Sequence, residues 1–523
     1  MSADAGIRET SPPVGAADST AALRRRWLLA VICVVFAALR LPVACRQIPA
    51  QDEDYFAVPG LTILREGIPR IPYMPSRNPE GAFYKADEVL FTLPPLYFYW
   101  QAVVYWLIGP STAAARVASL LCGVAAIVCV HRLAWHWFRN ESAALWSAGL
   151  YAGSRIVYFP VVIARPDMLC GALGLGILVA VSCWVRSDRR RWLVVAGAGI
   201  GAAGLTHPFA IVPAALATLW TLFVSRGWTN RVRNVAILVA AAVPVFALWL
   251  PLIRMHPEAF RIQFSNAVLN QSGQGIVSRA LLPWQSLRVQ TPIFLEHVGG
   301  LQAGLMIGAA VAATVWFIRR RDPGLRTVVL MTWGAIYLHV VCVGVHPTKG
   351  YWCYTGALTF ICAGGVIGQV LKRAREVGHR DPRPGTVAAV VVAGAIMLPG
   401  SGIRTVVAHL RHWDDINYDA ARFTRMLIEE TPADARLIVD PGYIFDFYRA
   451  GRDVTLGLDY AFFFSVRGTE YDLLVSGPSS IRDGVPETMQ GEFVRSYGDQ
   501  SDLFACYAEV YAAPSEDAAV ESR

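Results

Sequence analysis

Residues 27–44, WLLAVICVVFAALRLPVA, form an apolar run that directly follows three arginines. About 17–25 apolar residues are enough for a helix to cross the hydrocarbon core of a bilayer. Positive charges in front of such a run favour an uncleaved first span with its N-terminal side in the cytoplasm. The alternative is a cleavable signal peptide, with LPVAC ending at Cys45 as a lipoprotein-like cleavage site. Pro42 stands where that site requires leucine, and many further apolar runs follow, so we predict a membrane span.

The composition extends this prediction to the whole chain. Of its 523 residues, 54% are hydrophobic and only 16% are charged, and the mean hydropathy is +0.40. These values are typical of a polytopic membrane protein. The net charge of +8 comes from short clusters of arginine and lysine between apolar runs, which argues against nucleic-acid binding. The ten cysteines lie mostly within apolar runs without a CxxC pair, so neither a disulfide framework nor a zinc site is predicted.

Eleven apolar runs are long enough to be predicted as transmembrane helices: 27–44, 114–131, 140–160, 168–185, 192–206, 208–225, 235–252, 301–318, 327–345, 351–371 and 386–403. A twelfth run, 93–110, is excluded by the charge pattern. If every arginine cluster is cytoplasmic, an even number of spans separates consecutive clusters, so only two can cross between Arg26 and Arg132. The run 93–110 has Pro94 and Pro95 directly after its first residue and contains many aromatic residues, which favours a position in the outer interface.

This topology divides the chain into three parts. We predict an all-α polytopic membrane protein with a small C-terminal α/β extracytoplasmic domain. The predicted parts are a disordered cytoplasmic tail (1–23), a transmembrane domain (24–410) with a long first outer loop (45–111), and the outer domain (411–523). In the outer domain, ARLIVD (435–440), YDLLVSG (471–477) and FACYAEVYAA (504–513) read as strands, and GYIFDFYRA (442–450) reads as a short helix.

Three carboxylates, Asp52, Glu53 and Asp54, open the first outer loop in the stretch QDEDYFA (51–57). Next to a bilayer they repel one another and resist dehydration, so they need either a function or free access to water. The simplest interpretation is a solvated helix start, where acidic residues complement the helix dipole. Further candidate residues are predicted on the same face. The same loop contains Arg77, Tyr84, Lys85, Asp87 and Glu88, and other outer segments contain Arg165, Asp167, His207, Lys349, Tyr351 and Tyr354. Because all of these residues are predicted to lie on the same side of the membrane, we expect a functional site there.

Six stretches, in their order along the chain, resemble the GT-C glycosyltransferases of the protein O-mannosyltransferase and aminoarabinose (lipid A) transferase type. They are QDEDYFAVPGLTILREGIPRIP (51–72), LPPLYFYW (93–100), GPSTAAARVASLLCG (109–123), VIARPDML (162–169), GLTHPFA (204–210) and HPTKGYWCY (346–354). The resemblance covers roughly residues 27–371. It implies a GT-C fold and an inverting hexosyl or pentosyl transferase, which moves a sugar from a polyprenyl phosphate carrier to an acceptor outside the cytoplasm.

The resemblance also implies roles for individual residues. Asp52 falls on the catalytic base, with Glu53 as its neighbour, and Asp167 falls on the acidic residue of the second outer loop. The donor phosphate is expected at Arg165, Lys349 and Tyr351 or Tyr354. The chemistry requires such groups independently, because the acceptor must lose a proton and the leaving phosphate needs cations. Where the named enzymes carry lysine or histidine before Pro-Pro-Leu, this chain has Leu93, so Lys85 or Arg77 is expected to serve the phosphate instead.

The expected partners are a polyprenyl-phosphate-linked sugar, an extracytoplasmic acceptor (lipid, glycan or protein) and the lipid bilayer, without nucleic acid. The expected location is the inner (plasma) membrane, with the N-terminus in the cytoplasm. No cofactor is implied, and no cluster of ligands indicates a divalent metal. A transporter or lipid-carrier flippase is the main alternative, but such proteins place their charges near the midplane in two matching halves. A scaffold without activity is the second alternative.

Overall fold

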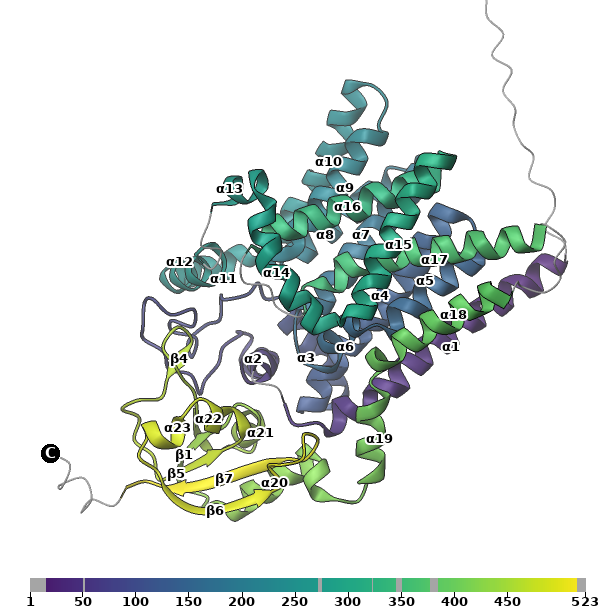
Figure 1. The fold of residues 1–523 in the computed structure, drawn as a ribbon. Coiled ribbons are helices and arrows are strands. Elements are labelled where there is room, and N and C mark those ends of the chain that lie inside the picture. The colour runs from purple at the N-terminus through teal and green to yellow at the C-terminus, as the bar shows by residue number, and fades with distance from the viewer. Residues whose placement is uncertain are drawn as a thin grey trace, which may run out of the picture.

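The computed structural model describes residues 16–49, 52–270, 275–321, 323–344, 350–376 and 384–514. It consists of a large helical part and a sheet domain at one end of the helices (Figure 1). Helix α1 (Ala16–Arg46) already includes residues 16–23, which the sequence analysis assigned to the disordered tail. The rest of that tail, residues 1–15, lies outside the described residues.

Seven helices of the described chain are long and apolar enough to cross a membrane. Their spans lie in α1, α4 (Thr112–Phe138), α7 (Asp167–Ser187), α10 with α11 (Trp228–Phe246 and Leu250–Met255), α15 (Gly300–Arg320), α16 (Pro323–Val343) and α17 (Trp352–Glu376). An eighth candidate is bent by 51° between α18 (Pro384–Met397) and α19 (Ile403–Arg411). The predicted count of eleven spans is therefore not confirmed.

The other three predicted spans are short or broken. Residues 140–160 form α5 (Glu141–Gly153) and α6 (Arg155–Val162), interrupted at Ser154. Residues 192–206 and 208–225 form α8 (Arg191–Gly204) and α9 (Ile211–Val224), separated by a turn at His207. The segment predicted to lie in the interface contains α3 (Leu96–Ile108), whose 13 residues reach about 20 Å, less than the ~30 Å hydrocarbon core. The segments predicted as outer loops contain α2 (Glu53–Glu66), α12 (Pro257–Phe264), α13 (Ile276–Leu281) and α14 (Pro283–Val298).

Small residues let the long helices approach closely. A Cβ at Gly364 of α17 would lie 2.5 Å from the backbone nitrogen of Ser147 in α5. A Cβ at Gly201 of α8 would lie 2.4 Å from the carbonyl oxygen of Ala242 in α10. Within a bilayer, where water does not drive helices together, such close backbone packing is a main source of association.

The sheet domain confirms the three strands and the helix predicted from the sequence. Its five strands have the order β2-β1-β5-β7-β6, with β1 parallel to β2 and β5, and with β7 antiparallel to β5 and β6. The strands are β1 (Arg436–Val439), β2 (Asp453–Leu456), β5 (Leu473–Ser476), β6 (Glu492–Gly498) and β7 (Tyr507–Ala512). The helices are α20 (Ala420–Glu430), α21 (Ile444–Arg449), α22 (Pro478–Arg482) and α23 (Val485–Thr488), and β3 (Asp459–Tyr460) pairs with β4 (Phe464–Ser465) in a separate hairpin.

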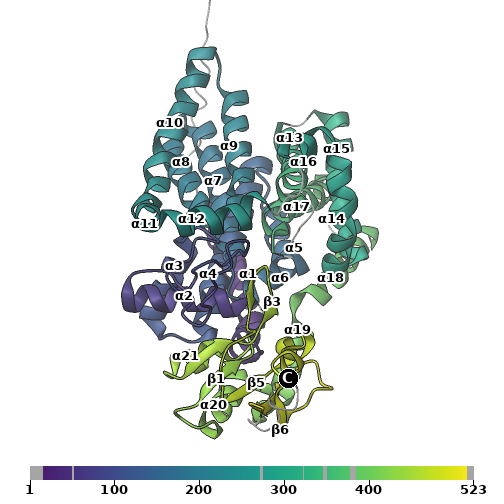
Figure 2. The same ribbon diagram turned by 90° about the vertical axis from the view of Figure 1, so that its left-hand side faces the viewer.

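The sheet domain and the first outer loop share one hydrophobic core. Val58 and Phe83 of the loop belong to the same cluster of buried side chains as Ile438 and Phe445 of the domain. Each of these four side chains is at most 4% exposed. The first outer loop and the C-terminal domain therefore lie at the same end of the helices (Figures 1 and 2).

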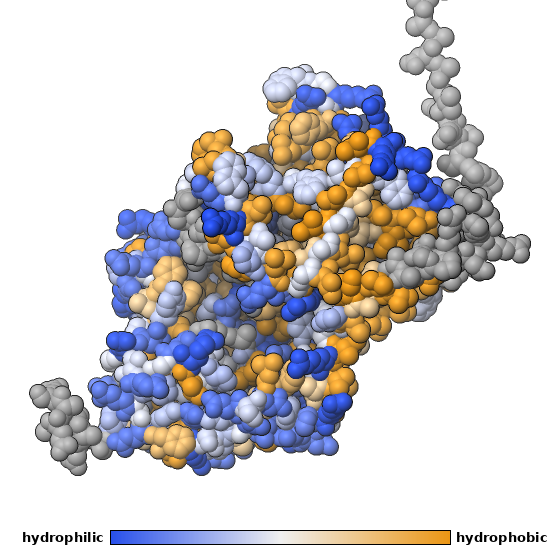
Figure 3. Space-filling view, viewed as in Figure 1, coloured by the Kyte–Doolittle hydropathy of each residue, from blue (hydrophilic) through white to orange (hydrophobic). Residues whose placement is uncertain are grey.

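The surface shows where a bilayer would fit. In Figure 3 hydrophobic residues dominate the face formed by the long helices, whereas hydrophilic residues dominate the sheet domain. Large apolar side chains such as Val34, Leu301 and Val391 are more than 60% exposed on these helices, which water would not favour. The helical part thus has the surface of a membrane protein, and the sheet domain has that of a domain in water.

Candidate active site

The acidic triplet lies at the start of α2, and its three carboxylates have different environments. The side chain of Asp52 is 34% exposed, whereas Glu53 and Asp54 are each 1% exposed. The helix begins at Glu53, so the carboxylates sit where the positive end of the helix dipole stabilises them. Asp52 is the member of the triplet that reaches solvent.

Asp52 is held through both of its carboxylate oxygens. The hydroxyl of Tyr55, one turn further along α2, donates to Oδ1 at 2.5 Å. Nη1 of Arg165 donates to Oδ2. Nε of the same arginine donates to Oδ2 of Asp167 at 2.7 Å, and its guanidinium lies 5.4 Å from the ring centre of Phe56. The structure thus brings together Asp52, Arg165 and Asp167 in a row, with the arginine between the two carboxylates.

Glu53 forms a different contact, with Arg116 of α4. The pair is bidentate, with Nε to Oε1 at 2.8 Å and Nη2 to Oε2 at 2.7 Å, and the two side chains are 1% and 2% exposed. Oε1 also accepts from the backbone N–H of Ala164 at 2.8 Å. Arg116 donates further to the carbonyl oxygens of Ala44 and Gln47. Glu53 therefore fastens the end of α1, the start of α2, α4 and the turn before Arg165 to one another.

Asp54 faces the sheet domain. Within the described part of the chain, no hydrogen bond reaches either of its carboxyl oxygens, while the hydroxyl of Tyr73 donates to its backbone carbonyl. Burial raises the pKa of Asp54 well above its usual value, and the nearby Asp440 and Glu53 add to the shift. The carboxyl group therefore keeps its proton more readily than an exposed aspartate does.

The predicted stretch 346–354 meets this row through Gly350. A Cβ at Gly350 would lie 2.6 Å from a carboxylate oxygen of Asp167, so the backbone of this residue packs directly on that acid. The ring of Tyr351 stacks on Phe209 at 5.8 Å and meets His207 edge to face at 5.1 Å. Burial lowers the pKa of His207 to about 4, so this imidazole is neutral at physiological pH.

The remaining predicted phosphate contacts lie elsewhere or outside the described residues. Lys349 lies outside them. Tyr354 is 1% exposed in the helical core, where its ring lies 2.9 Å from the position that a Cβ of Gly174 would take. Nζ of Lys85 pairs with Glu258 at 3.1 Å, and Arg77 pairs with Asp87. Of the predicted donor-phosphate residues, Arg165 contacts Asp52 directly.

Sequence reasoning missed two side chains of this site. Arg116 stands in the quoted stretch GPSTAAARVASLLCG, and an arginine within an apolar helix is itself a sign of a buried acidic partner. Tyr55 lies three residues after Asp52, which places the two on the same face of the helix. In the described residues no group of three or more His, Cys, Asp or Glu side chains is arranged to hold a metal ion.

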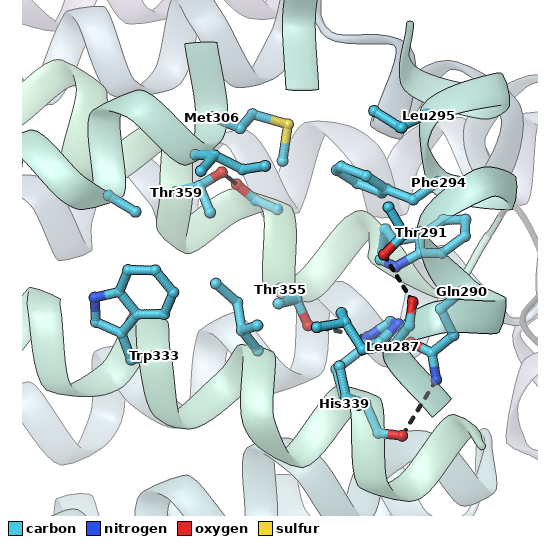
Figure 4. A pocket seen from close by; sticks show the side chains of 16 residues that line it. Leu287, Gln290, Thr291, Phe294, Leu295, Met306, Trp333, His339, Thr355 and Thr359 are labelled. Carbon is cyan, nitrogen blue, oxygen red and sulfur yellow. Dashed lines mark hydrogen bonds between the residues drawn. The ribbon is translucent and has the colours of Figure 1, made fainter. Parts of the chain in front are cut away.

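Two apolar cavities flank the stack of aromatic rings next to the row. One, of about 600 Å³, lies between α8, α9 and α10 and is lined by His207, Phe246 and Trp249 among others. The other, of about 280 Å³, lies between α14, α15, α16 and α17 (Figure 4). His339 lines this second cavity and contacts Phe209 at 5.2 Å. The rings of His207, Tyr351, Phe209 and His339 thus lie between the two cavities.

Comparison with known proteins finds a family model that matches part of the chain. The family model of the dolichyl-phosphate-mannose-protein mannosyltransferases matches residues 92–253, which include Arg116, Arg165, Asp167 and His207. A search of curated protein sequences finds no match.

Solved structures resemble the chain over a greater length. ArnT from Cupriavidus metallidurans bound to undecaprenyl phosphate has a TM-score of 0.60 and 16% identity, covering 96% of this chain and 99% of that chain. AglB from Archaeoglobus fulgidus, in complex with an inhibitory peptide and a dolichol-phosphate, has a TM-score of 0.51 and 12% identity, covering 95% of this chain and 75% of that chain. The chain therefore has the GT-C fold.

The GT-C fold, together with the family model that matches residues 92–253, supports a membrane glycosyltransferase of the GT-C type, as the sequence motifs predicted.

Proposed function

We propose that this glycosyltransferase moves a sugar, with inversion, from a polyprenyl phosphate carrier to an acceptor at the outer membrane face, with Asp52 as the base. The observation that carries the proposal is the solvent-reaching carboxylate of Asp52, fixed by Arg165 and Tyr55 at the end of the helices where the sheet domain lies. A sugar acceptor must lose a proton as it attacks, and a carboxylate within hydrogen-bond reach of it is suited to accept that proton.

The proposed step is a single displacement. The acceptor oxygen forms a bond to the anomeric carbon from the side opposite the phosphate, the bond from that carbon to the phosphate oxygen breaks, and the acceptor proton passes to Asp52. The polyprenyl phosphate leaves with the bonding electrons, so cations nearby lower the barrier. Arg165 is the proposed cation within the described residues, with Asp167 orienting it through Nε. Lys349, outside the described residues, remains a predicted phosphate contact.

Lys85, Tyr354 and Glu53 have weaker support for direct roles. Lys85 is already paired with Glu258, so binding a phosphate would require this pair to open. The hydroxyl of Tyr354 is buried among helices. We propose that Glu53 positions the site through Arg116 and does not react. The cavity beside His207 is the proposed place for part of the carrier's apolar chain, because its walls are hydrophobic and His207 contacts Tyr351, the neighbour of the Gly350 that packs on Asp167.

The proposed function is tested directly with purified protein in lipid nanodiscs and polyprenyl phosphates that carry radiolabelled sugars. We expect label to move to an acceptor extracted from the cell envelope and free polyprenyl phosphate to accumulate. Mass spectrometry of envelope lipids, glycans and proteins from a deletion strain would name the acceptor and sugar. Transport of the labelled carrier across the bilayer without any transfer would overturn the proposal in favour of a flippase.

We also propose that the protein lies in the plasma membrane with its N-terminus in the cytoplasm and the sheet domain outside. The arginine clusters support this orientation, and so does the shared core of the sheet domain and the first outer loop. A reporter fused at Asn140 should read as cytoplasmic, and reporters at Gly300 and at the C-terminus should read as outside. A cytoplasmic C-terminus would contradict the orientation.

A further inference from the structure

The hairpin of β3 and β4, which was not expected from the sequence, reaches Tyr55, the hydrogen-bond partner of Asp52. Its base is fixed by Asp459, whose carboxylate accepts from the hydroxyl of Ser465 at 2.8 Å and from Nε of Arg467 at 2.9 Å. From there the hairpin rises from the sheet toward the first outer loop (Figure 1).

The tip of the hairpin is docked on that loop through backbone atoms. The N–H of Ala82 donates to the carbonyl of Phe462 at 2.8 Å, and the side-chain amide of Asn78 donates to the carbonyl of Ala461 at 3.1 Å. The approach is close, since a Cβ at Gly81 would lie only 3.3 Å from the carbonyl oxygen of Phe462. These contacts fix the position of the hairpin tip relative to α2.

Docking brings the ring of Phe463 against Tyr55. The two ring centres are 6.3 Å apart with an interplanar angle of 25°. Phe83 completes the group, 5.0 Å from Tyr55 and 5.7 Å from Phe463, and Phe56 meets Tyr55 edge to face at 4.6 Å. Tyr55 is 7% exposed, so its ring is packed by three phenylalanines, one of which comes from the C-terminal domain.

We propose that Phe463 is a positioning residue of the transfer reaction, which acts through Tyr55 on Asp52. This inference rests on the proposed function. The hydroxyl of Tyr55 meets Oδ1 of Asp52 at 2.5 Å, and small errors in the placement of a reacting group lower rates strongly. Without Phe463 the tyrosine ring gains room on the side of the hairpin, and its hydroxyl no longer fixes the carboxylate. The sheet domain then takes part in the active site and does not merely cap it.

A double-mutant cycle distinguishes this role from simple domain docking. Phe463→Ala and Tyr55→Phe should each lower kcat about tenfold, with the KM for the donor nearly unchanged, because each removes the same fixed hydrogen bond to a charged group. The double variant should also be only about tenfold slower than the wild type. Phe463→Tyr keeps the ring and should restore most of the rate. Phe463→Leu is larger than alanine but lacks the ring that stacks on Tyr55, so it should still be several-fold slower than the wild type, and it covers the case in which Phe463→Ala does not fold.

Phe493→Ala provides the matched control, because that ring lies in β6 of the same domain, is 59% exposed and packs on Tyr511. It should leave kcat unchanged. A double variant about a hundredfold slower than the wild type, which is the product of the single effects, would overturn the role of Phe463, as would a Phe463→Leu enzyme as fast as the wild type. A wild-type protein that transfers no sugar would instead overturn the proposed function itself.

Discussion

Replacement of Asp52 by asparagine should lower the rate of sugar transfer by about 10²–10⁴-fold, the usual contribution of a general base. The amide is nearly the same size as the carboxylate, and its oxygen still accepts hydrogen bonds from Tyr55 or Arg165, so the protein should fold and bind the donor. What it loses is the ability to take the acceptor's proton. The measurement is transfer from a labelled polyprenyl phosphate sugar, with donor binding determined in parallel on the same preparation.

Asp54→Asn is the matched control for Asp52→Asn. The two residues are close in the same acidic triplet, but Asp54 is buried against the sheet domain, and burial raises its pKa. An amide that imitates the protonated acid should therefore be tolerated, with transfer close to the wild-type rate. Full activity of Asp52→Asn would refute its role as base. An inactive Asp54→Asn enzyme beside an active Asp52→Asn enzyme would show that the motif has been read out of register.

The sequence predicted which residues of the candidate site lie together more accurately than it predicted the environment of each of them. Apolar runs and arginine clusters predicted that the acidic triplet, Arg165 and Asp167 share one face, because hydropathy and charge act locally along the chain. Which carboxylate reaches solvent depends on tertiary packing. Asp52, Glu53 and Asp54 have the same charge and are consecutive in sequence, yet the first is half-buried and the other two are fully buried.

The fold, like the candidate site, was predictable only in part. Strands such as β1 and β5 are continuous apolar runs, and both were predicted. The hairpin of β3 and β4 was not, since its strands have two residues each and its position comes from contacts with a loop almost 400 positions away, such as that of Asn78 with Ala461. The predicted span count is not confirmed for a related reason, because the turn at His207 separates two helices too short to be counted as spans by length.

Replacement of Glu53, next to the proposed base, should lower the stability of the protein and not the rate of the chemical step, because Glu53 is paired with Arg116. The Glu53–Arg116 pair is almost completely buried, and removal of one partner from such a pair leaves an uncompensated charge, at a cost of about 3–5 kcal/mol. Glu53→Gln should therefore lower the thermal midpoint and the yield of monodisperse protein in detergent. The molecules that do fold should transfer sugar at nearly the wild-type rate. Asp87→Asn is the control, because it breaks the more exposed pair with Arg77, which is expected to contribute at most about 1 kcal/mol.

Replacement of Arg116 tests whether the unpaired charge causes the loss of stability. Arg116→Met should destabilise the protein like Glu53→Gln, but the double variant should be more stable than the sum of the two losses predicts, because no unpaired charge remains. Recovery should be incomplete, since Arg116 also donates to the carbonyl oxygens of Ala44 and Gln47, and these lose their donor in both variants that contain methionine. A Glu53→Gln protein with the wild-type thermal midpoint and no transfer activity would contradict this account and would place Glu53 in the chemistry beside Asp52.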